Sequence, residues 1–254
     1  IMPLFSLLGT LVVNNGMAFF SDAISHSAFA GVALGLIAGV HPHLAMPAFG
    51  VLVGLGIMAV GRHSSLSADT VIGVFFSAVV AFGLAVVSRH NTVARDLQQF
   101  LYGDILTIGE GDIQWLLALL VVFLIFQAFA CNRLLYIGLH PVVARAHGVP
   151  VARCQYLFAA LLALVVMFSV WGVGVLLVTA LLIVPAAAAR NFASTAGGMY
   201  WWALAISLSS SVAGLMLSAQ PWMGTATGAT IILAACVWFA ASAVWAALRG
   251  WRRD

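Results

Sequence analysis

Long apolar runs, separated by short segments that carry Gly, Pro or Arg, fill almost the whole chain. Most of them have the roughly 20 residues that a helix needs to cross a bilayer. Within lipid each run must be helical, because an unpaired backbone group there costs several kcal/mol. The first run is too short to span alone, so the pattern predicts an all-α, polytopic bundle with eight or nine spans. The nine runs cover residues 3–13, 17–40, 44–60, 70–87, 113–130, 154–170, 173–189, 199–218 and 225–248.

The composition leads to the same class of protein. Of the 254 residues, 64% are apolar and only 7% are charged, whereas soluble domains carry about 25% charged residues. So little charge cannot cover a surface in water, and the chain must be solvated by lipid. The runs leave no room for a separate soluble domain, which predicts a single transmembrane domain over residues 1–254.

Arginine positions predict which loops face the cytoplasm. If the segment 131–153 lies inside, alternation of the spans places eight of the ten arginines on the cytoplasmic side. This is the asymmetry that the positive-inside rule describes. The basic balance of the chain therefore reflects membrane topology, and we expect no nucleic-acid partner.

One acidic residue, Asp22, lies inside an apolar run, while the other six acids lie in loops, at span ends or at the C-terminus. His26 follows four positions later, and residues i and i+4 of a helix share a face with Cβ atoms about 5–6 Å apart. The serines at positions 21, 25 and 27 add hydroxyl groups nearby. An ionisable side chain in the membrane costs at least a few kcal/mol, so its presence indicates a functional site.

Asp and His together provide the ligand chemistry of Zn²⁺, Mn²⁺ or Fe²⁺, whereas Cu⁺ prefers sulfur. Two ligands are too few for a tight site, but a symmetric dimer with this helix at its axis would supply four. The residues alone leave two further roles open for the pair. It could form a hydrogen bond that locks helix packing, or it could act as a proton relay.

Four motifs in the same order resemble the permease subunits of the manganese/zinc/iron family of ABC importers. The first is the segment from residue 7 to residue 35, whose Ser-Asp-Ala-Ile-Ser-His-Ser core contains Asp22 and His26. The others are Asp-Thr-Val-Ile-Gly at 69–73, Tyr-Gly-Asp-Ile-Leu at 102–106 and the Leu/Val-rich stretch that ends Val-Pro-Ala-Ala at 184–187. The resemblance covers nearly the whole chain, and the fixed order makes it specific.

The resemblance implies a homodimer in a prokaryotic cytoplasmic (inner) membrane. It also implies two cytoplasmic ATPase subunits and an extracytoplasmic metal-binding protein as partners. The family's intramembrane metal ligands correspond to Asp22 and His26. No permanently bound cofactor is implied, because Zn²⁺ or Mn²⁺, with Fe²⁺ as a further candidate, is the transported substrate.

The resemblance also implies a coupling helix that docks into the ATPase, within the predicted cytoplasmic loop 131–153. The matching run is residues 140–149, in which Pro141 suits a first helical position and Gly148 a C-terminal cap. Ala144 and Arg145 lie between them. His140 and Val142 stand where the family usually carries Asp and Glu. This chain therefore lacks the acids that make the family's usual polar contacts to the ATPase.

A second histidine motif, His41-Pro42-His43, follows the second run on the predicted outer side. It could be an entry point for metal, or it could be just a turn built on Pro42.

The chain contains no lysine, so it cannot hold a phosphate-binding Gly-x-x-x-x-Gly-Lys-Ser/Thr loop. We therefore expect a transport subunit that is not itself an enzyme, with ATP hydrolysed on a partner. The chief alternative is a proton-coupled secondary transporter that uses Asp22 and His26 as a relay. An intramembrane metalloprotease would need a His-Glu-x-x-His motif, which is absent. Permeases for siderophores or vitamins carry different motifs.

Overall fold

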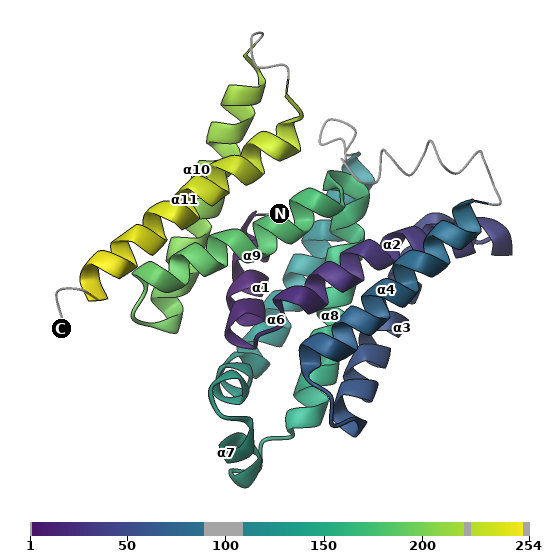
Figure 1. Ribbon diagram of the computed structural model, residues 1–254, viewed down its shortest axis with the longest axis horizontal. Coiled ribbons are helices and arrows are strands. Elements are labelled where there is room, and N and C mark those ends of the chain that lie inside the picture. Colours follow the sequence, from purple (N-terminus) through teal and green to yellow (C-terminus); the bar gives the residue numbers. More distant parts are fainter. Residues whose placement is uncertain (1, 89–108, 221–224, 251–254) are drawn as a thin grey trace. The chain divides into compact units, whose positions relative to one another are not determined.

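The computed structural model describes residues 2–88, 109–220 and 225–250, and over these ranges every regular element is a helix. Figure 1 shows their arrangement. The helices are α1 (Met2–Asn14), α2 (Ala18–Ala38), α3 (Pro42–His63), α4 (Ala68–Val87), α6 (Glu110–Leu139), α7 (Pro141–Ala146), α8 (Val151–Val173), α9 (Val175–Phe192), α10 (Ala196–Ser218) and α11 (Thr227–Gly250).

Each of the nine apolar runs forms one of these helices, which confirms the predicted all-α membrane bundle. Seven helices in the described part of the chain are long and apolar enough to cross a membrane, and α1 is a shorter apolar helix. α2 has 21 residues and carries Asp22, His26 and three serines; the count of seven does not include it. The span count therefore agrees roughly with the eight or nine expected.

One helix end differs from the pattern along the chain. α6 continues to Leu139, so the segment predicted as a cytoplasmic loop, 131–153, begins with helix and contains only about ten residues between α6 and α8. The hydrophobic run ended at Ala130 because polar Asn132 and Arg133 follow it, but a helix can continue beyond the bilayer into water. The motif at 102–106 lies outside the described residues.

Side chains that cap helices explain where two of these helices begin. The Ser67 hydroxyl accepts a hydrogen bond from the Thr70 backbone N–H at 3.2 Å, and α4 starts at the next residue. The Thr195 hydroxyl accepts one from the Gly198 N–H at 3.1 Å in the same position before α10. Each cap satisfies one of the four N–H groups that a helix start leaves without a partner.

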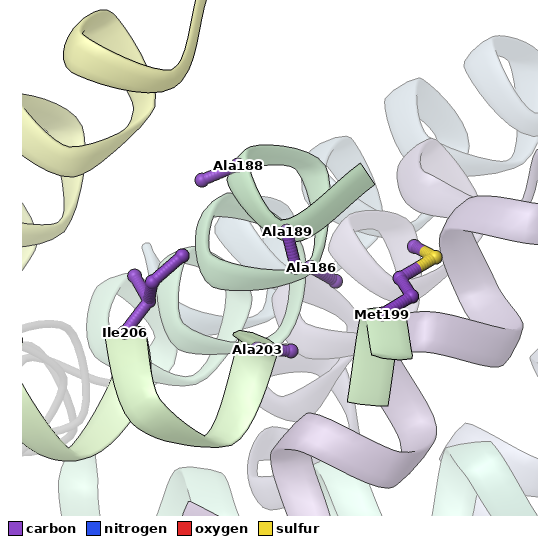
Figure 2. Packing of buried hydrophobic residues seen from close by; sticks show 6 residues of the cluster. All are labelled: Ala186, Ala188, Ala189, Met199, Ala203 and Ile206. Carbon is purple, nitrogen blue, oxygen red and sulfur yellow. The ribbon is translucent and has the colours of Figure 1, made fainter. Parts of the chain in front are cut away.

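Contacts within the chain gather into two compact units, which are described separately. One contains residues 1–16 and 176–254, and the other contains residues 17–175. In the first unit, alanines of α9 pack with Met199, Ala203 and Ile206 of α10 in a buried cluster (Figure 2). α10 also packs on α1 and α11, and a 3.0 Å hydrogen bond from the Asn191 amide to the Ser242 hydroxyl joins α9 to α11.

In the second unit, α2 packs against three helices, α3, α4 and α8, and α8 also packs on α3 and α6. The approach of α2 to α3 is close because α2 presents glycines to it. A Cβ atom added to Gly31 would lie 2.9 Å from the Met46 Cα, and one added to Gly35 would lie 2.7 Å from the Ala45 Cβ. Small residues at such interfaces allow backbones to approach closely in lipid.

We expect Gly31→Ala to lower the thermal unfolding midpoint in detergent, because its new methyl group meets the α3 backbone and overpacking of this kind costs about 1–3 kcal/mol. The control is Gly61→Ala on α3, where an added Cβ meets no atom within 4 Å. The control should unfold at an unchanged or slightly higher temperature. Equal midpoints for the two variants would contradict the close α2–α3 contact.

Candidate metal site

Helix α2 is buried over most of its surface and leaves one stripe accessible. Phe19 is 67% exposed, whereas Phe20, Ala23 and Ile24 are almost fully buried. Asp22 lies three positions after Phe19 and His26 lies four positions after Asp22, so both lie on that stripe, and both are partly exposed. The predicted shared face of the pair is therefore the face that α2 does not bury against its own chain.

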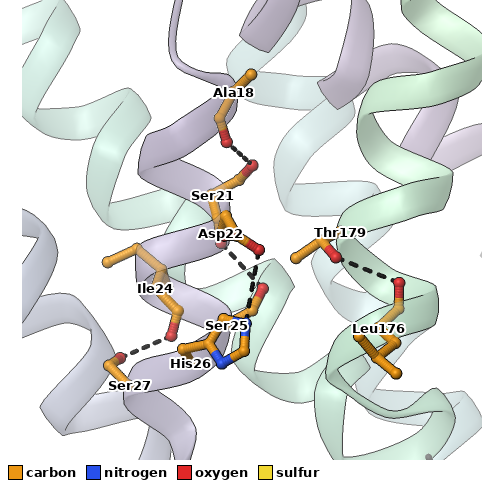
Figure 3. A network of polar contacts seen from close by, with 9 residues as sticks. All are labelled: Ala18, Ser21, Asp22, Ile24, Ser25, His26, Ser27, Leu176 and Thr179. Carbon is orange, nitrogen blue, oxygen red and sulfur yellow. Dashed lines mark hydrogen bonds and ion pairs between the residues drawn. The ribbon is translucent and has the colours of Figure 1, made fainter. Parts of the chain in front are cut away.

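The side chains of Asp22 and His26 converge on one point (Figure 3). The His26 Nε2 lies 3.8 Å from the Asp22 Oδ1, and the side chains are 24% and 37% exposed respectively. That distance exceeds the range of an N–H···O hydrogen bond. It is close to the roughly 3.4 Å at which a tetrahedral ion holds a nitrogen and an oxygen ligand. The separation is that of an ion pair, and it is also close to the spacing of two ligands on one metal ion.

Aromatic rings from two helices surround the His26 imidazole. The ring of Phe76, on α4, meets it edge to face with centroids 5.2 Å apart, and the ring of Phe29 lies 6.3 Å away. These contacts restrict rotation of the imidazole without supplying a competing polar group. α4 thus positions the histidine, a role that the sequence pattern did not reveal because Phe76 is one apolar residue among many.

The three serines of α2 do not point their hydroxyl groups at the pair. Ser21 donates to the Ala18 carbonyl at 2.7 Å, Ser25 to the Ser21 carbonyl at 2.9 Å and Ser27 to the Ile24 carbonyl at 2.7 Å. All three are fully buried. Bonds of this kind satisfy a serine within its own helix, so the serines serve packing in the bundle.

Among the described residues, one copy of the chain brings two candidate ligand side chains together at this point. No group of three or more His, Cys, Asp or Glu side chains that could hold a metal occurs among the described residues. A stable site of Zn²⁺ type takes four ligands. A metal ion held at this point would therefore need further ligands.

The sequence matches the family described as "ABC 3 transport family" over residues 3–246. The chain belongs to this family. Its resemblance to metal-importer permeases is thereby confirmed.

Two relatives illustrate the similarity of this ABC 3 family member. The chain is 32% identical to the high-affinity zinc uptake system membrane protein ZnuB of Haemophilus influenzae, over 92% of this chain and 89% of that protein. It is 31% identical to the manganese import system permease protein ScaB of Streptococcus parasanguinis, over 91% and 82% respectively. The solved structure of PsaBC from Streptococcus pneumoniae in complex with Fab superposes with a TM-score of 0.80. It is 29% identical in sequence and covers 95% of this chain and 86% of that one.

The histidines of the His41-Pro42-His43 motif lie together in this ABC 3 family chain. Their ring centroids are 5.3 Å apart, and the His43 ring packs on Trp171 of α8 with centroids 3.8 Å apart. Asp22 and His26 are not part of this cluster. The contact with Trp171 joins residues far apart in sequence, so no pattern along the chain could have indicated it.

Helix α7 occupies the segment in which the resemblance implies a coupling helix. Pro141 is its first residue, Ala144 is fully buried and Arg145 is exposed in the last turn. Gly148 has a φ of 77°, and hydrogen bonds from Gly148 N–H to the Arg145 carbonyl and from Val149 N–H to the Ala144 carbonyl close the helix. This is the Schellman arrangement, in which the residue after the helix end adopts the left-handed conformation that favours glycine.

A contact that the sequence did not indicate joins the end of α7 to α6. The His147 Nδ1 lies 3.1 Å from the Tyr136 hydroxyl and 2.9 Å from the Val143 carbonyl oxygen. The tyrosine is on α6, just before its end, so the contact holds the short helix against the long one.

We expect Ser25→Ala to leave metal affinity at the Asp22–His26 pair within about twofold, because the Ser25 hydroxyl is bonded to its own helix. Asp22→Asn, which keeps the size of the side chain and removes its charge, should weaken binding by about tenfold or more. Zinc binding to the purified protein, measured by isothermal titration calorimetry, would compare the two. A large loss of affinity in Ser25→Ala would make the serine a ligand and contradict this geometry.

Proposed function

We propose that the chain is the membrane-spanning permease subunit of an ATP-driven importer for divalent transition metal ions. The observation that carries the proposal is the Asp22–His26 pair, which converges at 3.8 Å on the accessible stripe of α2. A carboxylate and an imidazole inside an apolar helix indicate a pathway for ions. Relatives named for the transport of zinc, manganese and iron support the same class of substrate.

A homodimer completes the site. A stripe that exposes Asp22 and His26 cannot face lipid, because burial of a charged group in hydrocarbon costs at least a few kcal/mol. If two copies of α2 face each other across a two-fold axis, two carboxylates and two imidazoles surround one point. Four ligands of this kind suit Zn²⁺, Mn²⁺ and Fe²⁺. Zn²⁺ or Mn²⁺ is the proposed substrate, with Fe²⁺ as the third candidate.

ATP is hydrolysed on partner subunits in this proposal, because the chain has no lysine with which to build a phosphate-binding loop. The full importer would contain two permease protomers, two cytoplasmic ATPases and an extracytoplasmic metal-binding protein, in a prokaryotic inner membrane. Metal would pass between the protomers as closure of the ATPases alternates access to the Asp22–His26 site.

The proposed ATPase contact is α7 together with the cap that follows it. Pro141 is the first residue of the helix and Gly148 forms its C-terminal cap. Ala144 is buried against the rest of the chain, so Arg145 and the opposite face are exposed and can contact a partner. Val142 is 75% exposed on that face, and Leu139 and Val143 are exposed beside it. This surface is apolar where the family usually carries acids, so the ATPase should present an apolar surface to it.

The first test of the proposed function is metal analysis and uptake. We expect the desalted dimer to hold about one Zn²⁺ or Mn²⁺, since four ligands serve one ion. Asp22→Ala/His26→Ala should lose both this metal and ATP-driven uptake into proteoliposomes. His63→Ala, a histidine in the last turn of α3, is the matched control and should change neither.

The alternative results separate the candidate functions. Metal that the double variant still holds after desalting, together with unchanged uptake, would move the pathway site elsewhere. Absence of metal from both proteins, combined with uptake that follows a proton gradient and needs no ATPase, would establish the proton-coupled transporter instead.

The second test concerns the apolar coupling surface. We expect Val142→Glu to weaken ATPase binding by about tenfold, because a charge buried in an apolar contact is destabilising. Val142→Leu, which keeps the surface apolar, should bind like the unchanged protein. Binding of purified ATPase to the detergent-solubilised permease can be measured by surface plasmon resonance. Equal or tighter binding of Val142→Glu would show that the partner makes the family's usual polar contacts.

A further inference from the structure

The turn between α2 and α3 brings two histidines to one place. α2 ends at Ala38, Gly39 has a φ of 67°, and the Val40 N–H donates to the Gly35 carbonyl at 2.9 Å. His41 then precedes the first residue of α3, Pro42, with an extended ψ of 129°, and its side chain makes no capping hydrogen bond. His41 is thus outside the helix and His43 is within its first turn.

This break in the backbone is what allows the imidazoles to approach each other. Two residues separated by one position on a regular helix point about 200° apart. Here the ring centroids lie 5.3 Å apart, and the ring planes differ by 24°. An ion with metal–nitrogen distances of about 2.0–2.1 Å and tetrahedral angles holds two imidazole centroids about 5 Å apart. The centroid spacing therefore matches that of two imidazoles bound to one ion.

Trp171 restrains one of the two ligands. The His43 ring packs on the indole of Trp171 with centroids 3.8 Å apart and planes tilted by 51°. Trp171 lies in the last turn of α8, the candidate span with the largest buried share. His43 is half-buried and His41 is exposed. One imidazole is thus held by packing, as good metal sites require, and the other remains open to solvent.

The turn lies at the opposite end of α8 from α7 (Figure 1). α7 precedes Val151, the first residue of α8, whereas Trp171, which contacts His43, lies 20 positions after Val151. Twenty helical residues extend about 30 Å, the thickness of the hydrocarbon core. If α7 meets a cytoplasmic ATPase, as the proposed function requires, the two histidines lie at the outer surface. They connect through α2 to the pathway pair, about 18 Å along the helix from His26 to Ala38.

We propose that His41 and His43, with His43 held by Trp171, form an outer loading site that binds a divalent transition metal before it reaches Asp22 and His26. The inference rests on the proposed function for its sidedness but not for the site itself. Two imidazoles suit Zn²⁺ and related ions, and water supplies the other ligands. Such a site releases its ion readily, as a loading site must. The helix end of α2 in the same turn opposes the positive field of the α3 start, which would otherwise disfavour a cation.

The test isolates this site from the pathway pair. The full chain carrying Asp22→Ala/His26→Ala is reconstituted in lipid nanodiscs and titrated with radioactive Zn²⁺ at equilibrium. We expect about one ion per chain to remain bound, since each copy has its own histidine turn. His41→Ala and His43→Phe, each added to this background, should weaken binding by at least about tenfold, because even partners beyond the ligands are worth that much.

The chosen substitutions keep the fold measurable. His41 is exposed and caps nothing, and the phenylalanine at position 43 retains an aromatic ring against Trp171 while removing both nitrogens. His63→Ala on the same background is the control for an exposed histidine elsewhere and should bind as before. Matching thermal midpoints would show that all variants fold.

Two results would overturn the proposal. If the Asp22→Ala/His26→Ala protein binds no Zn²⁺, or if both histidine variants bind as tightly as the background, the cluster is an aromatic packing feature only. Neither result affects the proposed function, which fails instead if Asp22→Ala/His26→Ala leaves uptake of metal unchanged.

Discussion

The cost of placing a carboxylate and an imidazole inside an apolar helix constrains most of what is distinctive about this protein. Asp22 and His26 interrupt α2, and burial of such groups in hydrocarbon costs at least a few kcal/mol. The three serines beside them avoid that cost by bonding to their own helix, whereas Asp22 and His26 form an ion pair at 3.8 Å, which is longer than a hydrogen bond. In the proposed importer, a metal ion shared with a second copy of the chain would complete the site, and the ligand chemistry of the pair fits such an ion.

The packing around α2 determines where that partner can come from. Glycines allow α3 to approach one side of the helix, and α4 and α8 cover others, so only the stripe with Phe19, Asp22 and His26 stays accessible. Phe76 of α4 limits rotation of His26 from within the unit. A rigid surround of this kind orients the two ligands before an ion arrives, which reduces the entropy that binding must overcome.

The two ends of α8 present different chemistry, and together they suggest a direction for transport. At one end, α7 exposes an apolar face and is held to α6 through the Tyr136–His147 contact. At the other end, Trp171 packs on His43 beside His41. In the proposed importer the first end would receive force from the ATPase and the second would receive metal, with the Asp22–His26 pair of α2 between them.

Hydrophobic patterning by itself determined the class of fold, the nine long apolar elements and the Asp22–His26 pair. It could do so because lipid enforces helices over apolar runs and because the i, i+4 spacing is a local property of a helix. The apolar pattern did not indicate that α6 continues to Leu139, because a helix can extend beyond the bilayer into a polar stretch of sequence. Only the tertiary structure decided which face of α2 remains accessible, that Phe76 supports His26 and that Trp171 supports His43. Each of these depends on contacts between residues distant in sequence, whose side chains carry no local signal of their partners.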